Sequence, residues 1–173
     1  MNEATRLWVF AAIFSIASYA VSAGLSLGTA AYAASIFLDP VVNLTLPLLI
    51  LSVGFQAINK RGGALAIGII TAALFALSFM FFLTITELIA GALTEVSAYF
   101  VGYRGLKAST INTAVFGLSE GALSVEIGAL FLHYAVPALP LVAFAVAFAA
   151  LGAFIGYLGE SISSYLVRSG IMK

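Results

Sequence analysis

The chain has no cysteine, one histidine, one tryptophan and few charged residues. Without cysteine it forms no disulfide and no thiolate metal site, and a single histidine does not build a typical transition-metal centre. We therefore expect neither a metal nor another cofactor. The sequence also has no H-E-x-x-H and no P-loop motif, and no nucleophile, base and acid set is visible. We expect no enzyme activity, so any ATP hydrolysis would come from a partner protein.

Charge is scarce, and apolar residues take its place. Charged residues make up 8% of the 173 residues and hydrophobic ones 63%, whereas a soluble domain carries about 25% charged residues. One water-soluble core cannot hide so much apolar surface, so we expect the lipid bilayer to be the solvent. The sequence predicts a single integral membrane domain over residues 1–173 and argues against a nucleic-acid partner.

Apolar runs separated by polar turns predict an all-α protein with six transmembrane helices. Asp39-Pro40 has the pattern of a helix start, and residues 59–63 and 104–109 are polar turns. Thr84 and Glu87 have the spacing of a capping box. Residues 24–38 are interpreted as a loop or re-entrant segment, and residues 160–173 as a helical extension at the interface. The expected spans are residues 7–23, 39–58, 64–83, 84–103, 110–133 and 138–157.

Basic residues are distributed unevenly between the two ends of these spans. With six spans, the segments on the side of the N-terminus hold every lysine and arginine of the chain: Arg6, Lys60, Arg61, Arg104, Lys107, Arg168 and Lys173. The positive-inside rule then predicts that both termini are cytoplasmic. A seven-span arrangement would spoil this asymmetry.

Three pairs of glycines have the spacing at which helix backbones approach closely: Gly24/Gly28, Gly117/Gly121 and Gly152/Gly156. We interpret them first as packing positions between helices of this chain. Association with other membrane proteins is the other interpretation.

Four glutamates lie within the apolar sequence: Glu87, Glu95, Glu120 and Glu126. A carboxylate at the centre of a membrane helix costs roughly 2.5–3.5 kcal/mol or more, so we look for a use for each. Counted along their helices, Glu95 and Glu120 are expected near the midplane, where they would face an outward-opening cavity. Glu87 fits a helix cap equally well, and Glu126 fits a wetted position. Protonated carboxyls bonded to neighbouring helices are the alternative for Glu95 and Glu120.

Aromatic and imidazole groups share helix faces with these carboxyls. One predicted helix carries a stripe of Glu87, Gly91, Glu95, Tyr99 and Tyr103, and His133 lies two turns after Glu126. Carboxylates beside aromatic rings suit an organic cation through charge pairing and cation–π contact. Tyr99 also fits an interfacial anchor, and His133 a capping residue. The candidate substrate-binding residues are Glu95, Glu120, Tyr99, Glu87, Glu126 and His133.

Two segments carry a resemblance to a known family. They read INKRGGALAIGI from Ile58 and ELIAGALTEVSAYFVGYR from Glu87. Both resemble the substrate-binding membrane subunits, or S-components, of energy-coupling factor (ECF) vitamin transporters, and the similarity is greatest to the group linked to thiamine and hydroxymethylpyrimidine. The resemblance implies a compact six-helix bundle in the plasma membrane of a prokaryote. It also implies high-affinity binding of a small vitamin or precursor, with Glu95 within the shared motif.

The resemblance also implies partners. An S-component docks onto a transmembrane coupling subunit that carries two ATPase subunits, through small residues of its first helix. The matching positions here are Ala11, Ser15, Ser18 and Ser22, for which helix packing within the chain is the alternative. Residues 24–38 would be a lid over the site. Thiamine sites commonly stack the ligand on tryptophan, but Trp8 lies far from the expected cavity, so stacking would fall to another aromatic residue: Tyr99, Tyr19, Tyr32, Phe37 or Phe81.

Two other functions remain open. A proton-coupled secondary transporter of small organic cations would use midplane carboxylates as proton carriers and need no ATPase. A membrane module without transport activity would use them only as hydrogen-bond donors between helices.

Overall fold

The computed structural model describes residues 2–25, 40–41, 44–133 and 135–170. Six helices were expected, and the described residues form six with no strand, so the predicted all-α class is confirmed. The predicted loop at residues 24–38 lies outside the described residues except for its first two, which end the first helix. Tyr32, Phe37 and Asp39 also lie outside them. The helices are α1 (Glu3–Leu25), α4 (Leu46–Ile58), α5 (Gly63–Leu77), α6 (Phe81–Val101), α7 (Leu106–Phe131) and α8 (Ala138–Arg168).

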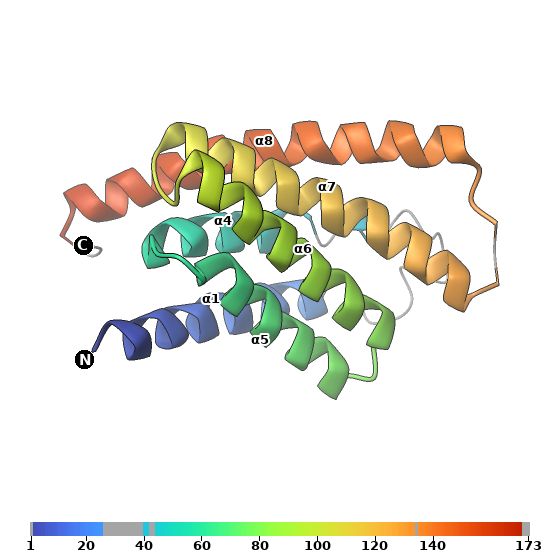
Figure 1. Cartoon of the computed structure of the whole chain (residues 1–173), viewed down its shortest axis with the longest axis horizontal. Coiled ribbons are helices and arrows are strands. Elements are labelled where there is room, and N and C mark those ends of the chain that lie inside the picture. The colour runs from blue at the N-terminus through green and yellow to red at the C-terminus, as the bar shows by residue number, and fades with distance from the viewer. Residues whose placement is uncertain (1, 26–39, 42–43, 134, 171–173) are drawn as a thin grey trace.

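The helices form one elongated bundle (Figure 1). Helices α5, α6, α7 and α8 pack in chain order, each against the next, and α4 packs against α1, α5, α7 and α8. Figure 1 shows α8 along one side, α1 along the opposite side, and both chain ends at the same end of the bundle. Buried apolar side chains of α4, α7 and α8, among them Leu48, Phe116 and Phe148, fill the centre.

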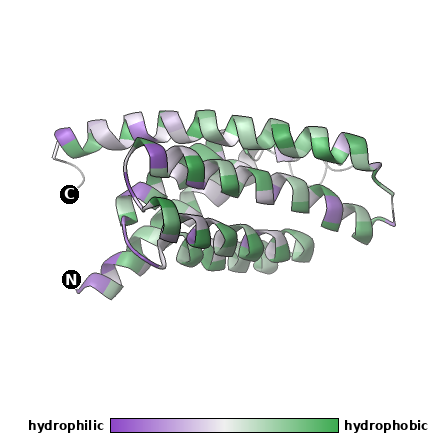
Figure 2. Cartoon of the chain, turned by 45° about the horizontal axis from the view of Figure 1, so that its top comes forward, coloured by the Kyte–Doolittle hydropathy of each residue, from purple (hydrophilic) through white to green (hydrophobic). Residues whose placement is uncertain are grey.

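The polar residues gather at the end where the two termini lie (Figure 2). This end also carries the turn between α4 and α5, the turn between α6 and α7, and the C-terminal part of α8. All the lysines and arginines of the described residues lie on these segments or on the first turn of α1 or α7: Arg6, Lys60, Arg61, Arg104, Lys107 and Arg168. We call it the basic end of the bundle.

Four helices, α1, α6, α7 and α8, are long and apolar enough to cross a membrane. Helices α4 and α5 are apolar but have 13 and 15 residues, fewer than the roughly 17–25 that a full crossing needs. Several apolar helices of membrane-spanning length in one chain indicate a multi-pass membrane protein.

Two predicted spans have other bounds in the structure. Pro40 and Val41 are helical, in agreement with the predicted helix start, but residues 44–45 form a turn, and helix α4 begins only at Leu46, with Pro47 in its first turn. Pro47 is tolerated there because the first N–H groups of a helix have no partner within it. Helix α5 ends at Leu77 instead of residue 83, and a tight turn follows in which Phe79 has φ 60°. Residues 78–80 contain neither glycine nor proline, so the sequence carried no turn signal.

Glycines allow the closest contacts between helices. A Cβ placed on Gly68 of α5 would lie 2.9 Å from the Cα of Gly91 on α6. A Cβ on Gly152 of α8 would lie 2.6 Å from the carbonyl oxygen of Thr113 on α7. Helix packing within the chain is thus confirmed for Gly152/Gly156 and for Gly117, whose Cβ would lie 3.5 Å from the Cα of Gly152. Gly91 therefore contacts a neighbouring helix and is not part of a ligand-binding face.

Candidate functional site

Glu87 points into the bundle from the seventh position of α6. The helix begins at Phe81, and the hydroxyl of Thr84 donates to the carbonyl of Met80 at 3.3 Å. The predicted capping box of Thr84 and Glu87 is therefore wrong, since both residues lie inside the helix. The side chain of Glu87 is 3% exposed, so it is a buried carboxyl and needs an explanation other than capping.

Glu120 of α7 faces the same interior space. The antiparallel pairing of α6 and α7 explains why. The number of residues from Glu87 to the last residue of α6, Val101, equals the number from the first residue of α7, Leu106, to Glu120. Two packed antiparallel helices joined by a short turn place such residues at the same height. Glu120 is 7% exposed.

The two carboxyls line one small cavity of about 10 Å³. This volume holds about one water molecule. The other lining residues come from α1, α4 and α5 and provide hydroxyls, aromatic rings and apolar groups: Ser18, Tyr19, Ser22, Pro47, Leu48, Leu51, Thr71 and Phe75. We call this space the carboxyl cavity.

Two polar atoms at the carboxyl cavity have no hydrogen-bond partner among the described residues: Oε2 of Glu87 and Oγ1 of Thr71. Buried polar atoms are nearly always bonded, so an orphaned one needs an explanation. Here a carboxylate oxygen and a hydroxyl face the same space. The pair can accept and donate to one bound group.

The electrostatics of the carboxyl cavity favour a positive guest. None of the described residues that line it is basic. Burying two negative charges close together is costly, because they repel each other where little water can screen them. A shared proton or a bound cation removes that cost. The cavity therefore suits a proton, an inorganic cation or the charged group of an organic cation.

One of the five aromatic candidates for stacking lies at the cavity. Tyr19 of α1 lines it and meets the ring of Phe75 edge-on at 5.3 Å between centroids. Its hydroxyl is hydrogen-bonded to Ser78. The interpretation of Tyr99 as a stacking residue is wrong for this cavity, because Tyr99 is 62% exposed and the guanidinium of Arg61 lies 5.4 Å from its ring centroid.

Glu95 is not in the carboxyl cavity. Its Oε1 accepts hydrogen bonds from the N–H of Gly62 at 2.6 Å and from the hydroxyl of Tyr103 at 2.9 Å. Its Oε2 accepts from the N–H of Ala64 at 3.1 Å. The expected meeting of Glu95 with Glu120 at the midplane is therefore wrong. Glu95 reaches from α6 to the basic end and caps α5, whose own cap residue, Gly62, has no side chain to do so.

Tyr103 completes this capping contact. Burial, together with the hydrogen bond to the carboxylate of Glu95, raises the pKa of Tyr103 to about 12 from its usual value of 10. Its hydroxyl therefore stays protonated at neutral pH and remains a donor to Glu95. The contact ties the turn after α6 to the start of α5.

Glu95→Ala is expected to lower the free energy of unfolding by about 2–3 kcal/mol, because hydrogen bonds to a charged group contribute about 1.5–3 kcal/mol. The matched control is Glu126→Ala. Glu126 is an exposed carboxylate on α7, and we expect a change within about 0.5 kcal/mol. Unfolding of both purified variants in the same detergent measures the difference. Equal stabilities would contradict the capping role.

The remaining predicted ligands lie outside the cavity. Glu126 and His133 are exposed. His133 has φ 54° and follows the end of α7. Its position agrees with the alternative interpretation, a residue that ends a helix.

The small residues of α1 face the chain's own helices. Ala11, Ser15, Ser18 and Ser22 are all buried. The hydroxyl of Ser15 donates to the carbonyl of Ile67 at 3.2 Å, and that of Ser18 donates to the carbonyl of Pro47 at 3.1 Å. In this structure the four residues are not available to a partner, which corrects the docking interpretation in favour of packing within the chain. Ser18 and Ser22 also line the carboxyl cavity.

Sequence reasoning named Tyr19 among the candidate stacking residues but missed the hydroxyls of Ser18 and Thr71 at the cavity. A register count from the turn between α6 and α7 would have paired Glu87 with Glu120. Nothing in the sequence marks Thr71. Comparison with known proteins gives no further identification: no family model matches the chain, and neither a curated protein nor a solved structure is significantly similar to it.

Proposed function

We propose that the chain is a membrane-embedded binding protein that holds the charged group of a small organic cation between Glu87 and Glu120. The observation that carries the proposal is the pair of buried carboxyls at one cavity, with Oε2 of Glu87 unpartnered among the described residues. A cationic group would offset both negative charges and lie next to the unpartnered Oε2 of Glu87. Tyr19 and Phe75 would offer ring surface beside it.

The resemblance of two segments to S-components suggests the biological role. On this proposal the chain is the substrate-binding subunit of an ECF-type importer, it captures a thiamine-related vitamin or precursor, and partner subunits hydrolyse ATP. The basic end would be cytoplasmic by the positive-inside rule. The carboxyl cavity would then lie in the outer half of the membrane, since Glu87 is within two turns of the start of α6 at the opposite end.

A ligand larger than one water needs space that the carboxyl cavity of about 10 Å³ does not offer in this structure. Binding of a vitamin therefore requires the lining helices or side chains to move apart. The expected consequence is slow association, because binding that needs a conformational change has a lower association rate.

A thermal-unfolding screen of the purified protein tests the proposal. Thiamine, hydroxymethylpyrimidine, other vitamins and simple quaternary ammonium ions would be added separately. A ligand present at 100 times its Kd stabilises the folded state by about 2.7 kcal/mol, so the Tm should rise with the concentration of one cationic compound. No shift with any of these compounds would refute binding of this class.

The small volume also favours a second candidate, a proton-coupled transporter of small cations. Two facing carboxyls that share one proton need no larger cavity. Uptake into proteoliposomes that contain only this protein, driven by a pH gradient, would support this candidate. Uptake that appears only with added coupling and ATPase subunits would support the importer subunit.

A further inference from the structure

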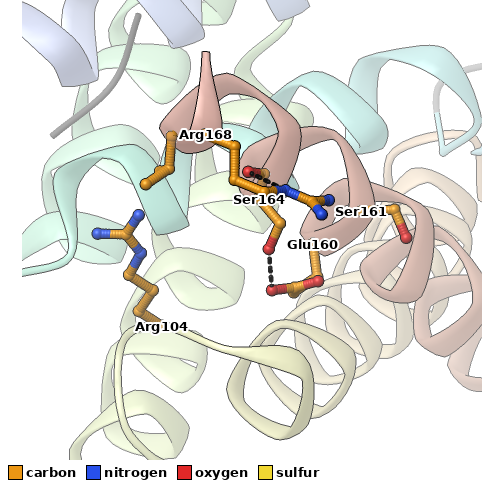
Figure 3. Close-up of a pocket in the computed structure, with 6 residues that line it drawn as sticks. Arg104, Glu160, Ser161, Ser164 and Arg168 are labelled. Carbon is orange, nitrogen blue, oxygen red and sulfur yellow. Dashed lines mark hydrogen bonds between the residues drawn. The ribbon is translucent and has the colours of Figure 1, made fainter. Parts of the chain in front are cut away.

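A cavity at the basic end is separate from the carboxyl cavity. Its volume is about 470 Å³, within the roughly 300–1,000 Å³ of typical ligand pockets. Arg104 enters it from the turn between α6 and α7, and the other lining residues come from the last turns of α8 (Figure 3). Those residues are Glu160, Ser161, Ser164, Val167 and Arg168.

The two arginines keep most of their hydrogen-bonding capacity. Within the described chain, the guanidinium of Arg104 makes no ion pair or hydrogen bond. Arg168 donates only from Nε, to the carbonyl of Ser164 at 3.3 Å. Among the described residues, Glu160 is the one carboxylate that lines the cavity, and it accepts from the hydroxyl of Ser164 at 2.6 Å. The described lining therefore carries two positive charges and one negative charge, which makes it cationic.

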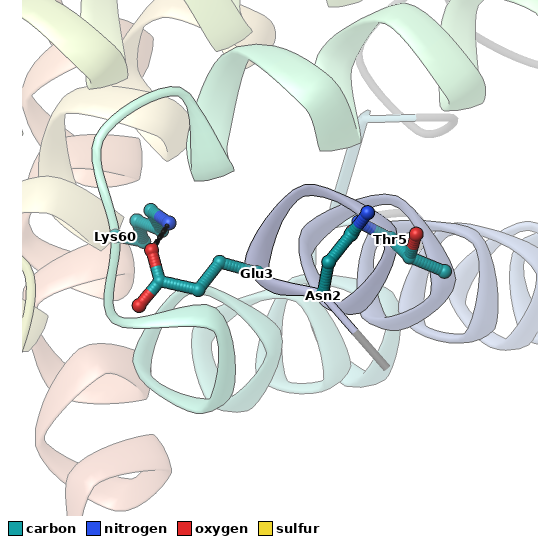
Figure 4. Close-up of polar contacts among 4 residues, drawn as sticks. All are labelled: Asn2, Glu3, Thr5 and Lys60. Carbon is teal, nitrogen blue, oxygen red and sulfur yellow. Dashed lines mark hydrogen bonds and ion pairs between the residues drawn. The ribbon is translucent and has the colours of Figure 1, made fainter.

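A neighbouring cavity at the same end differs in how its basic residue is paired. It is lined by Glu3, Lys60 and other residues, and Arg104 lies between the two cavities. There Lys60 pairs with Glu3 (Figure 4), so the chain itself neutralises that lysine. The side chains around Arg104 and Arg168 offer no such pairing among the described residues.

We propose that the cavity between Arg104 and Arg168 binds a phosphate group. The guanidinium fork matches phosphate oxygens in pairs. An anionic phospholipid is one source of the phosphate. Below the cavity, α8 exposes an apolar stripe on which acyl chains can lie, formed by Phe154, Leu158, Ile162 and Tyr165. Soluble phosphate is the other source.

Native mass spectrometry of the purified protein with added phosphatidylglycerol or phosphatidylcholine tests the lipid source. A cation near the membrane surface contributes enough binding energy for about a fivefold change in affinity. We therefore expect Arg104→Gln and Arg168→Gln each to weaken phosphatidylglycerol binding about fivefold. Lys107→Gln is the control, because Lys107 is an exposed basic residue at the same end that does not line the cavity.

Thermal unfolding with inorganic phosphate, compared with chloride at equal ionic strength, tests the soluble source. A phosphate-specific rise in Tm that both arginine variants lose would assign the site to soluble phosphate. Retained phosphatidylglycerol binding and an unchanged phosphate effect in folded Arg104→Gln and Arg168→Gln proteins would overturn the proposal. An equal loss in Lys107→Gln would also overturn it, because the effect would then come from general surface charge.

Discussion

Replacing Glu87 or Glu120 with glutamine is expected to weaken binding of the cationic ligand by about 100-fold. Glutamine has nearly the same size and still forms hydrogen bonds, but it carries no charge. Losing one partner of a buried charge pair costs about 2–5 kcal/mol or more, and each 1.4 kcal/mol is a factor of ten in affinity. Isothermal titration with the compound that raises the Tm measures the effect.

The same variants should fold at least as well as the parent protein. Each removes one of two carboxyls that share a cavity without a basic neighbour among its described lining residues, so their mutual repulsion disappears. Lower affinity with unchanged or higher Tm therefore separates a binding role from a structural one. A large loss of stability would instead favour a role in bonds between helices.

Glu126→Gln is the matched control for binding. Glu126 lies on the same helix as Glu120, carries the same group and is exposed. We expect its affinity for the ligand to equal that of the parent protein. If Glu126→Gln weakened binding as much as Glu120→Gln, the effect would come from the overall charge of the chain. The carboxyl cavity would then not be the ligand-binding site.

Gly156→Ala is expected to destabilise the bundle by about 1–3 kcal/mol, the usual cost of forcing atoms into a packed interior. A Cβ at this position of α8 would lie 2.5 Å from the carbonyl oxygen of Ser109 and 2.8 Å from the Cα of Thr110. Both are backbone atoms of α7, so the two helices must separate to admit the methyl group. The hydroxyl of Ser109 would also lose its bond to the carbonyl of Gly156, now 2.7 Å long.

Gly24→Ala is a control that should not lower the stability. No atom of the described residues lies within 4 Å of a Cβ built on Gly24, which is exposed near the end of α1. Alanine favours a helix over glycine by up to about 1 kcal/mol, so this variant should be as stable as the parent protein or more so. Thermal unfolding of both variants in one detergent gives the comparison. Equal Tm values for Gly156→Ala and Gly24→Ala would contradict the close packing of α7 on α8.

The number and class of the helices followed from the sequence because apolar runs and polar turns are local signals. Boundaries were less certain where the turn itself is apolar. The break at Phe79 lies between Leu77 and Phe81, among residues as hydrophobic as the helices beside them. Only contacts with other helices determine where such a run bends.

The error about Glu95 has the same origin. Its depth was counted from assumed helix ends, and an end displaced by a few residues moves a carboxyl from the cavity to the basic end. The hydrogen bonds of Glu95 join it to residues 62, 64, 65 and 103, which are distant from it along the chain or lie beyond its helix. No pattern around Glu95 indicates that another helix lacks a cap. The packing of α5 on α6 decides that Glu95 caps α5.

The sequence by itself determined that the chain belongs in a membrane, that it is helical, and that its cations lie on one side. These properties depend on composition and on the order of apolar and polar segments. The tertiary structure decided which carboxyls meet, which face of α1 is buried and which arginines stay unpaired. Those outcomes depend on helix register and rotation, and a shift of one residue turns a side chain by 100°.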